Sequence, residues 1–258
     1  MVLVSLGSVY GGAVTAGGAL WMWGWGGHGN LGLGKRVRRA VAPVRVEGEL
    51  AGRRVVGVAC TRGQPGFLGG PSGAAAGGAE GPHTVAVTAG GEMFTFGTCH
   101  KGLACNLGNK DGAFGRAEWD ELSPYRVGRR VRNGEDKPPL SPLSVWPPPY
   151  DAVGPIVGAV SGHIHAASLG ADGRAWAWGC GSNDGRCGVE RFLNKHGDAG
   201  RPAVDTMKCY LMNPHRIGAA RARYWPHGSG LDSQRVLVLA TGRNHMACIA
   251  VAAGRKEA

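Results

Sequence analysis

Histidine is the residue of this 258-residue chain that most clearly suggests a catalytic or metal-binding role, because it recurs at regular intervals. His83, His165 and His245 are separated by 82 and 80 residues, and Tyr10 stands 73 residues before His83. Histidine can bind a metal or move a proton near neutral pH. An active site rarely needs the same ring in every unit of a repeat. We therefore predict a structural role, in which a ring nitrogen bonds a neighbouring backbone group.

Cysteine could supply metal ligands or redox chemistry. The chain has seven cysteines, at positions 60, 99, 105, 180, 187, 209 and 248, and no CxxC pair. A zinc site needs four suitably spaced ligands, so we predict no metal site and no cofactor. Thiols in the loops at 99–105 and 180–187 could approach one another, which leaves redox pairing open. The odd count and the lack of a convincing export signal indicate reduced thiols, in the cytoplasm or nucleus.

The usual signatures of catalytic sites are missing from the sequence. It has no Gly-x-Ser-x-Gly, no phosphate-binding loop, and no dinucleotide fingerprint between a strand and a helix. Single carboxylates such as Asp120, Asp172 and Asp184 have no evident catalytic partner. The sequence therefore predicts a protein that is not an enzyme.

Basic residues cluster twice, and the formal net charge is +11. The clusters are Lys35, Arg36, Arg38 and Arg39, then Arg126, Arg129, Arg130 and Arg132. If the two clusters occupy equivalent places in a repeat, they form one basic rim that attracts an acidic partner. The alternative is a set of solvated loop residues. Nucleic acid is a less favoured partner because the charge is spread along the chain.

The elements that must position these residues repeat along the chain. Each has a Gly-Gly or Asp-Gly turn, then a strand that ends in an aromatic residue and glycine. The endings are Trp23-Gly24, Phe96-Gly97 and Trp178-Gly179. The three glycines are 73 and 82 residues apart, the same spacings that separate Tyr10, His83 and His165. Independent insertions would not keep two markers in step, so the pattern indicates a repeat architecture.

The repeat closely resembles the regulator of chromosome condensation repeat, each unit of which supplies a four-stranded blade of a β-propeller. Residues 23–34 match that family's Trp-Gly-x-Gly-x-x-Gly-x-Leu-Gly-x-Gly loop. The resemblance implies an all-β fold. We expect the aromatic residue before each glycine to fill the space between blades, and the glycines to allow sharp turns.

We predict one propeller domain over residues 1–258, with three complete units and half of a fourth. The units are 1–46, 54–127, 156–217 and 235–252, with loop inserts at 63–82, 128–155 and 218–234. Propellers of this family usually have seven blades. The chain could be part of a longer propeller, which we favour, could hold unrecognised blades in its inserts, or could be completed by another chain.

Members of the family mostly act as binding platforms, which makes a protein-interaction scaffold the leading hypothesis. The alternatives are nucleotide exchange on a Ran-like small GTPase and association with chromatin or nucleic acid. Light sensing, known in the same fold, is disfavoured because the tryptophans of that pattern are missing. No apolar run reaches the ~18 residues of a membrane span.

Overall fold

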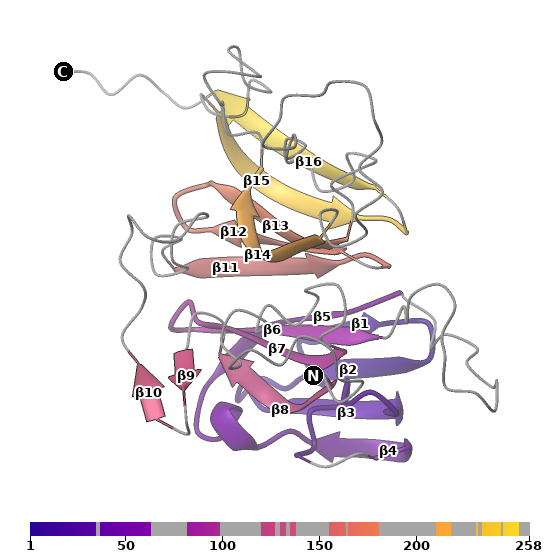
Figure 1. Ribbon diagram of the computed structural model, residues 1–258. Coiled ribbons are helices and arrows are strands. Elements are labelled where there is room, and N and C mark those ends of the chain that lie inside the picture. Colours follow the sequence, from indigo (N-terminus) through magenta and orange to yellow (C-terminus); the bar gives the residue numbers. More distant parts are fainter. Residues whose placement is uncertain are drawn as a thin grey trace, which may run out of the picture.

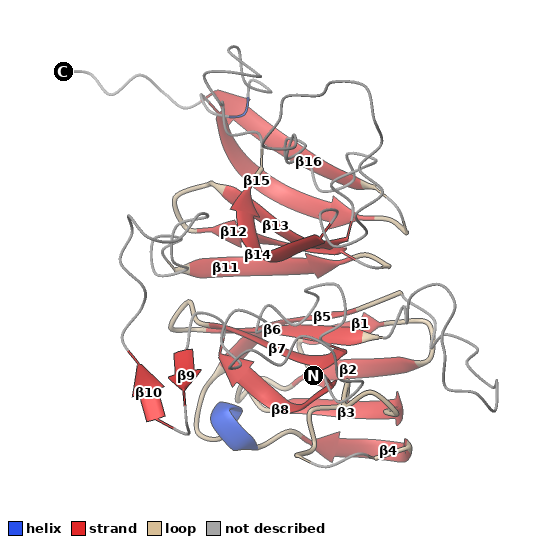
Figure 2. Ribbon diagram, in the orientation of Figure 1, coloured by secondary structure: helices blue, strands red, loops and turns tan. Residues whose placement is uncertain are grey.

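A computed structural model shows several short antiparallel sheets in the described part of the chain (Figures 1 and 2). The structure describes residues 1–34, 37–62, 82–98, 120–126, 130–132, 135–137, 155–163, 165–180, 210–217, 231, 234–243 and 245–252. These ranges hold β-strands, their turns and the short 3-10 helix η1 (Gly48–Leu50). The predicted all-β fold is confirmed. Most of the inserts 63–82 and 218–234 lie outside the described residues.

Three four-stranded sheets follow one another along the chain, and each is ordered as in the sequence. We call each of them a blade. Blade 1 contains β1 (Leu3–Leu6), β2 (Tyr10–Val14), β3 (Leu20–Trp25) and β4 (Arg39–Arg45). Blade 2 contains β5 (Val55–Cys60), β6 (His83–Thr88), β7 (Met93–Thr98) and β8 (Asp120–Arg126). Blade 3 contains β11 (Ile156–Ser161), β12 (His165–Gly170), β13 (Ala175–Cys180) and β14 (Tyr210–Arg216).

A two-stranded sheet follows blade 3. It contains β15 (Gln234–Thr241) and β16 (Met246–Ala252), which pair antiparallel. We call it the half-blade. Figure 1 shows it beside blade 3, in the order that the chain dictates. Among the described residues the chain thus forms three blades and a half-blade, as the repeat predicted.

The register explains why the two sequence markers stay in step. Tyr10 pairs with Gly24, His83 with Gly97, and His165 with Gly179. The marker residues therefore lie opposite each other on the second and third strands of each blade. In all three blades the pairing of the third and fourth strands shifts just before this glycine. Because the same irregularity recurs, each blade is a copy of one backbone template.

Glycine is required at this template position. Gly24, Gly97 and Gly179 have φ angles of 101°, 106° and 100°, which side-chain-bearing residues rarely adopt. A Cβ on Gly24 would lie 2.6 Å from Cα of Tyr10, and one on Gly97 would lie 2.6 Å from the carbonyl oxygen of Pro82. The strand opposite approaches too closely for any side chain.

Hydrogen bonds join each blade to the next at the hairpin turns. The amides of Val55, Ile156 and Val236 donate to the carbonyls of Gly18, Gly91 and Gly173, each at 2.9 Å. Val55 and Ile156 begin the first strands of blades 2 and 3, and Val236 is the third residue of β15 in the half-blade. Each carbonyl belongs to the turn of the preceding blade. The blades therefore stack with a constant offset.

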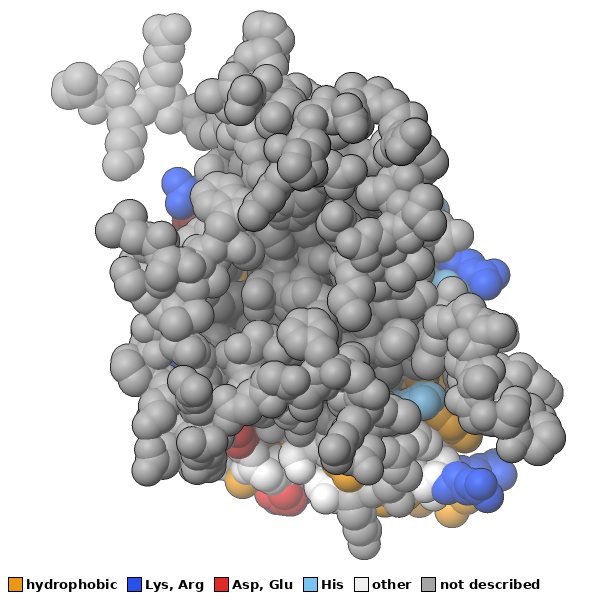
Figure 3. Space-filling model, viewed as in Figure 1, with side chains coloured by type: hydrophobic (Ala, Val, Ile, Leu, Met, Phe, Trp, Pro, Cys, Tyr) orange, Lys and Arg blue, Asp and Glu red, His pale blue; other side chains and the backbone are white. Residues whose placement is uncertain are grey.

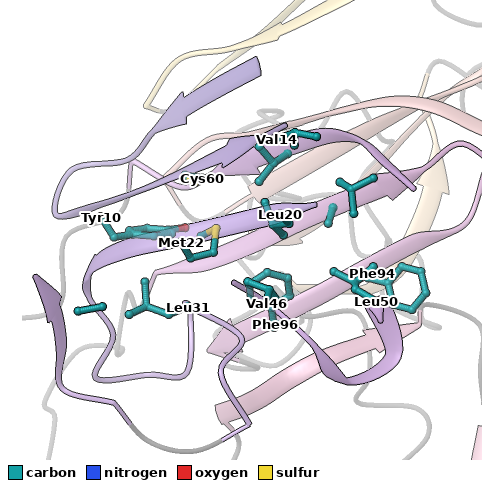
Figure 4. Close-up of a cluster of buried hydrophobic side chains, with 14 residues drawn as sticks. Tyr10, Val14, Leu20, Met22, Leu31, Val46, Leu50, Cys60, Phe94 and Phe96 are labelled. Atoms are coloured by element: carbon teal, nitrogen blue, oxygen red, sulfur yellow. The ribbon is translucent and has the colours of Figure 1, made fainter. Parts of the chain in front are cut away.

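Aromatic side chains fill the space between neighbouring blades. Phe94 and Phe96 of blade 2 pack with Leu20 and Met22 of blade 1 in a buried cluster (Figure 4). Trp176 and Trp178 of blade 3 pack in the same way on the side of blade 2. The equivalent Trp23 of blade 1 is only partly buried, because no described sheet precedes its blade. The predicted inter-blade packing is thus seen for Phe96 and Trp178, and only in part for Trp23.

The predicted loop insert 128–155 contains secondary structure that we did not expect. Within it, β9 (Arg130–Arg132) pairs antiparallel with β10 (Glu135–Lys137). Asn133-Gly134 stands between the two strands in the sequence, and Asn-Gly between short extended runs is a strong hairpin signal. The prediction of a loop is therefore wrong for residues 130–132 and 135–137. No helix in the described ranges is long and apolar enough to cross a membrane.

Candidate interaction surface

The repeated histidine position lies in a buried polar network between blades. The hydroxyl of Tyr10 donates to the carbonyl of His83 at 2.5 Å and accepts from the amide of Thr61 at 2.9 Å. The hydroxyl of Thr84 is 3.1 Å from that of Tyr10. Burial raises the pKa of Tyr10 well above its ordinary value, so its hydroxyl stays protonated and can donate. Tyr10 thus ties blade 1 to the backbone of blade 2.

His83 makes the corresponding contact from blade 2 to blade 3. Its side chain is fully buried, and its Nε2 lies 2.9 Å from the hydroxyl of Ser161. We expected a backbone group as the partner of the ring. The partner is a side chain instead, because Ser161, the last residue of β11, lies beside the ring. The pKa of His83 is lowered to about 3, mainly because the ring is buried and further because His165 and His163 lie nearby. The ring is neutral near pH 7 and joins two blades.

The stability of the protein should fall as the pH drops below about 6.5. The folded chain keeps His83 neutral down to pH 3 or so, whereas the unfolded chain takes up a proton near its ordinary pKa of 6.5. Protonation therefore favours the unfolded chain, by about 2 kcal/mol at pH 5. Urea unfolding at pH 7.5 and pH 5 measures this change. His83→Gln should reduce the fall and the exposed His245→Gln should not; equal falls in both variants would contradict this assignment.

The turns that join the first and second strands form a continuous row across the blades. The hydroxyl of Ser8 donates to the carbonyl of Arg62 at 2.6 Å. The amide of Arg62 donates to the carbonyl of Gly162 at 3.3 Å, and the amide of His163 donates to that of Arg243 at 3.2 Å. These bonds hold the turns of successive blades at one end of the sheets. We call that end the turn rim.

Four arginines lie on the turn rim. Arg62 and Arg243 belong to the row of turns. Arg39 pairs with Trp25 at the end of β3, and the carbonyl of Arg38 accepts from the amide of Gly26 at 3.0 Å. All four side chains are exposed. Figure 3 shows blue Lys and Arg side chains at two places on the right-hand edge of the molecule, on the side where β11 ends in Figure 1, and others at the upper left.

The guanidinium groups of the turn rim have no carboxylate partner among the described side chains. Asp120 and Glu121 begin β8 opposite Thr98 and Gly97, and only their backbone is described. Among the described side chains, exposed arginines of blades 1 and 2 and of the half-blade therefore present positive charge along one end of the sheets.

Arg126 lies at the other end of its blade. It ends β8 and pairs with Phe94, as Arg45 ends β4 and pairs with Trp21. Arg39 begins the fourth strand of its blade, whereas Arg126 ends one, and each of these strands has seven residues. The two basic clusters are therefore not equivalent, and Arg39 and Arg126 do not share a rim. Lys35, Arg36 and Arg129 lie outside the described residues, and for Arg130 and Arg132 only the backbone, in β9, is described.

The arginines at the opposite end are paired with carboxylates. Arg126 is 3.4 Å from Glu92, which also pairs with Arg53. Arg45 is 3.1 Å from Glu47, and Arg174 is 3.5 Å from Asp172. This end thus carries mixed charge. Neither Arg62 nor Arg243 was predicted from the sequence. Arg243 stands two residues before His245, as His163 stands before His165, whereas the insert 63–82 separates Arg62 from His83.

Neither described free cysteine forms part of a reactive cluster. Cys60 is buried, and burial raises the pKa of its thiol to about 12, so it is a poor nucleophile. Cys248 is exposed. Within the described ranges no three His, Cys, Asp or Glu side chains are grouped as metal ligands would be.

The comparison with known families decides what the repeat is. The model of the regulator of chromosome condensation (RCC1) repeat matches residues 17–63, which span β3, the glycine-rich loop, β4 and β5. Residues 17–63 thus match one RCC1 repeat. The resemblance predicted from the sequence is therefore confirmed. No curated protein sequence matches the chain.

Solved structures of RCC1-type propellers have a similar fold. Human WBSCR16 matches 96% of this chain with 19% identity and a TM-score of 0.58. Yeast RCC1 (Prp20) bound to Kap60 matches 98% with 12% identity and a TM-score of 0.63. Prp20p from Saccharomyces cerevisiae, described with its binding to Gsp1p and histones, matches 98% with 12% identity and a TM-score of 0.60.

The described blades correspond to part of such a propeller. The matched regions cover only 45%, 43% and 44% of the three larger chains, so this chain spans less than half of their length. The prediction of a partial propeller is confirmed. Identities this low show the shared fold alone.

Proposed function

We propose that this protein is a non-enzymatic scaffold that binds the acidic face of a protein partner through its turn rim. The observation that carries the proposal is the difference between the two ends of the blades. On the turn rim, Arg38, Arg39, Arg62 and Arg243 are exposed and have no described carboxylate partner. At the other end, arginines pair with Glu47, Glu92 and Asp172.

Arginines that pair with no described carboxylate suit a protein contact. A guanidinium group can bond a carboxylate with two parallel hydrogen bonds, and a surface of one sign speeds the encounter with a surface of the other. The Prp20 structures support the class of partner, since Prp20 is bound to Kap60 in one and described with Gsp1p and histones in the other.

The test compares two variants that lose the same charge. The first replaces Arg39, Arg62 and Arg243 with alanine, and the control replaces Arg45, Arg126 and Arg174. The probe is a fluorescein-labelled poly-glutamate peptide, followed by fluorescence anisotropy at low salt. We expect the turn-rim variant to bind at least tenfold more weakly and the control variant to change less than twofold. Added salt should weaken binding of the wild-type protein.

Three results would contradict the proposal. Equal weakening in both variants would show that net charge alone binds the probe. Tighter binding of duplex DNA than of poly-glutamate, through the same arginines and with a steep salt dependence, would indicate a nucleic-acid partner. Faster nucleotide release from a Ran-type GTPase would make the protein an exchange factor.

A further inference from the structure

Trp25 is an aromatic residue that the repeat does not require. The aromatic position of each blade comes just before the glycine of positive φ, whereas Trp25 comes just after Gly24. At that place blade 2 has Thr98 and blade 3 has Cys180. Trp25 is also partly exposed. The architecture of the blade therefore does not explain why a large aromatic residue stands here.

The positions that pack between blades lie earlier on the same strand. In blade 2, the side chains of the third strand that pack on the preceding blade are Phe94 and Phe96. Their equivalents in blade 1 are Trp21 and Trp23. The glycine that follows has a φ of 101°, and the pairing of β3 with β4 shifts there. Trp25 stands beyond this irregularity, at the end of β3.

This end of β3 belongs to the turn rim. The amide of Trp25 donates to the carbonyl of Val9 at 3.0 Å, next to Ser8, which joins the row of turns. Arg39 pairs with Trp25 across the sheet, and both Arg38 and Arg39 are exposed. Figure 3 shows His and hydrophobic side chains next to the lower group of blue side chains on the right-hand edge, on the side where β3 ends in Figure 1. The rim thus carries an aromatic surface beside its positive charge.

The glycine-rich loop holds the indole in place. A Cβ on Gly27 would clash with the ring of Trp25, so the backbone of the loop lies directly against it. The ring of His28 meets the indole edge-on, with 5.4 Å between the centroids. The side-chain amide of Asn30 donates to the carbonyl of Trp25 at 2.8 Å, and the carbonyl of Asn30 accepts from the hydroxyl of Thr84 at 2.8 Å. A ring that is fixed before binding loses little conformational entropy on contact.

We propose that Trp25 and Arg39 together bind an acidic protein segment that carries an aromatic residue between its carboxylates. The aromatic ring of the partner packs on the exposed part of the indole, and Arg38 and Arg39 bind the flanking carboxylates. Tryptophan and arginine are the residues that most often dominate such contacts. The site is part of the turn rim and rests on the function proposed above. The arginines attract acidic segments in general, and Trp25 selects among them.

The test uses two fluorescein-labelled peptides of equal charge, Glu-Glu-Glu-Phe-Glu-Glu-Glu and Glu-Glu-Glu-Ala-Glu-Glu-Glu, followed by fluorescence anisotropy with the full chain. We expect the wild-type protein to bind the phenylalanine peptide about fivefold more tightly or better. Trp25→Ala should bind the two peptides with affinities within about twofold of each other, because the indole is lost. Trp25→Phe, which keeps an aromatic ring, should retain most of the preference.

Trp21→Ala is the matched control. Trp21 lies on the same strand, is also partly exposed, and pairs with Arg45 as Trp25 pairs with Arg39. It lies at the other end of the blade, where Arg45 is bound to Glu47. This variant should keep the full preference for the phenylalanine peptide. Urea unfolding of each variant checks that it is folded at the temperature of the binding experiment.

The inference about Trp25 would be overturned by equal binding of the two peptides to the wild-type protein, by a preference that Trp25→Ala keeps, or by one that Trp21→Ala also loses. The alanine variant of Arg39, Arg62 and Arg243 separates this failure from failure of the proposed function. If that variant weakens both peptides and the wild-type protein shows no preference, the turn rim still binds acidic segments and only the role of Trp25 is wrong. If neither peptide depends on these arginines, the proposed function itself is wrong.

Discussion

Gly97→Ala should lower the free energy of unfolding by about 3 kcal/mol or more. Gly97 has a φ of 106°, so alanine would have a strained backbone there. Its Cβ would also lie 2.6 Å from the carbonyl oxygen of Pro82 and 2.8 Å from Cα of His83. Both are backbone atoms held by the pairing of β6 and β7, so neither can move aside without breaking the sheet. Urea unfolding followed by tryptophan fluorescence measures the loss.

Gly158→Ala is the matched control. Gly158 also lies in a strand, but a Cβ there would meet nothing within 4 Å, and Val238 occupies the equivalent place in the half-blade. We expect its stability to stay within about 0.5 kcal/mol of wild type. A similar cost at Gly158 and Gly97 would show that close backbone approach does not explain the repeated glycine.

Phe96→Ala should cost about 3–5 kcal/mol of stability. The ring is fully buried between blades 1 and 2 (Figure 4), and a Cβ on Gly32 would lie only 2.9 Å from it. Truncation therefore leaves a cavity that the flanking sheets cannot close. The same urea titration measures the effect, and Phe96→Leu, which keeps most of the apolar volume, should cost roughly 1–1.5 kcal/mol.

Trp23→Ala supplies the comparison at the same position of the repeat. Trp23 is partly exposed, because no described sheet packs on the outer face of blade 1. Its truncation should cost less than half as much as that of Phe96, although the ring is larger. Equal losses in the free energy of unfolding would mean that packing between blades does not determine how much the aromatic residue stabilises the protein.

The repeat, its strands and its fold could be predicted from the sequence because they depend on local features. Glycine at a positive φ, an aromatic residue before it, and histidine opposite it lie within one blade, so their spacing is visible in the chain. The partner of His83 could not be predicted in this way. Ser161 lies 78 residues away in another blade, and no spacing rule connects them.

The candidate surface was predicted only in part. Arg38 and Arg39 lie on the turn rim, but Arg126 lies at the opposite end. The sequence places both clusters after a glycine-rich loop, and it does not show that one precedes the fourth strand while the other follows it. Arg62 and Arg243 come together only through bonds between successive turns. The β9–β10 hairpin was missed because its Asn-Gly signal stands within a segment rich in charge.

The central claim is that the turn rim contacts the partner, and arginine side-chain NMR tests it most directly. Signals of the Nε–H groups are followed while the poly-glutamate peptide is added. We predict that Arg38, Arg39, Arg62 and Arg243 shift together with one affinity, and that Arg45, Arg126 and Arg174 stay in place. Shifts confined to the second group, or spread evenly over both groups, would contradict the claim.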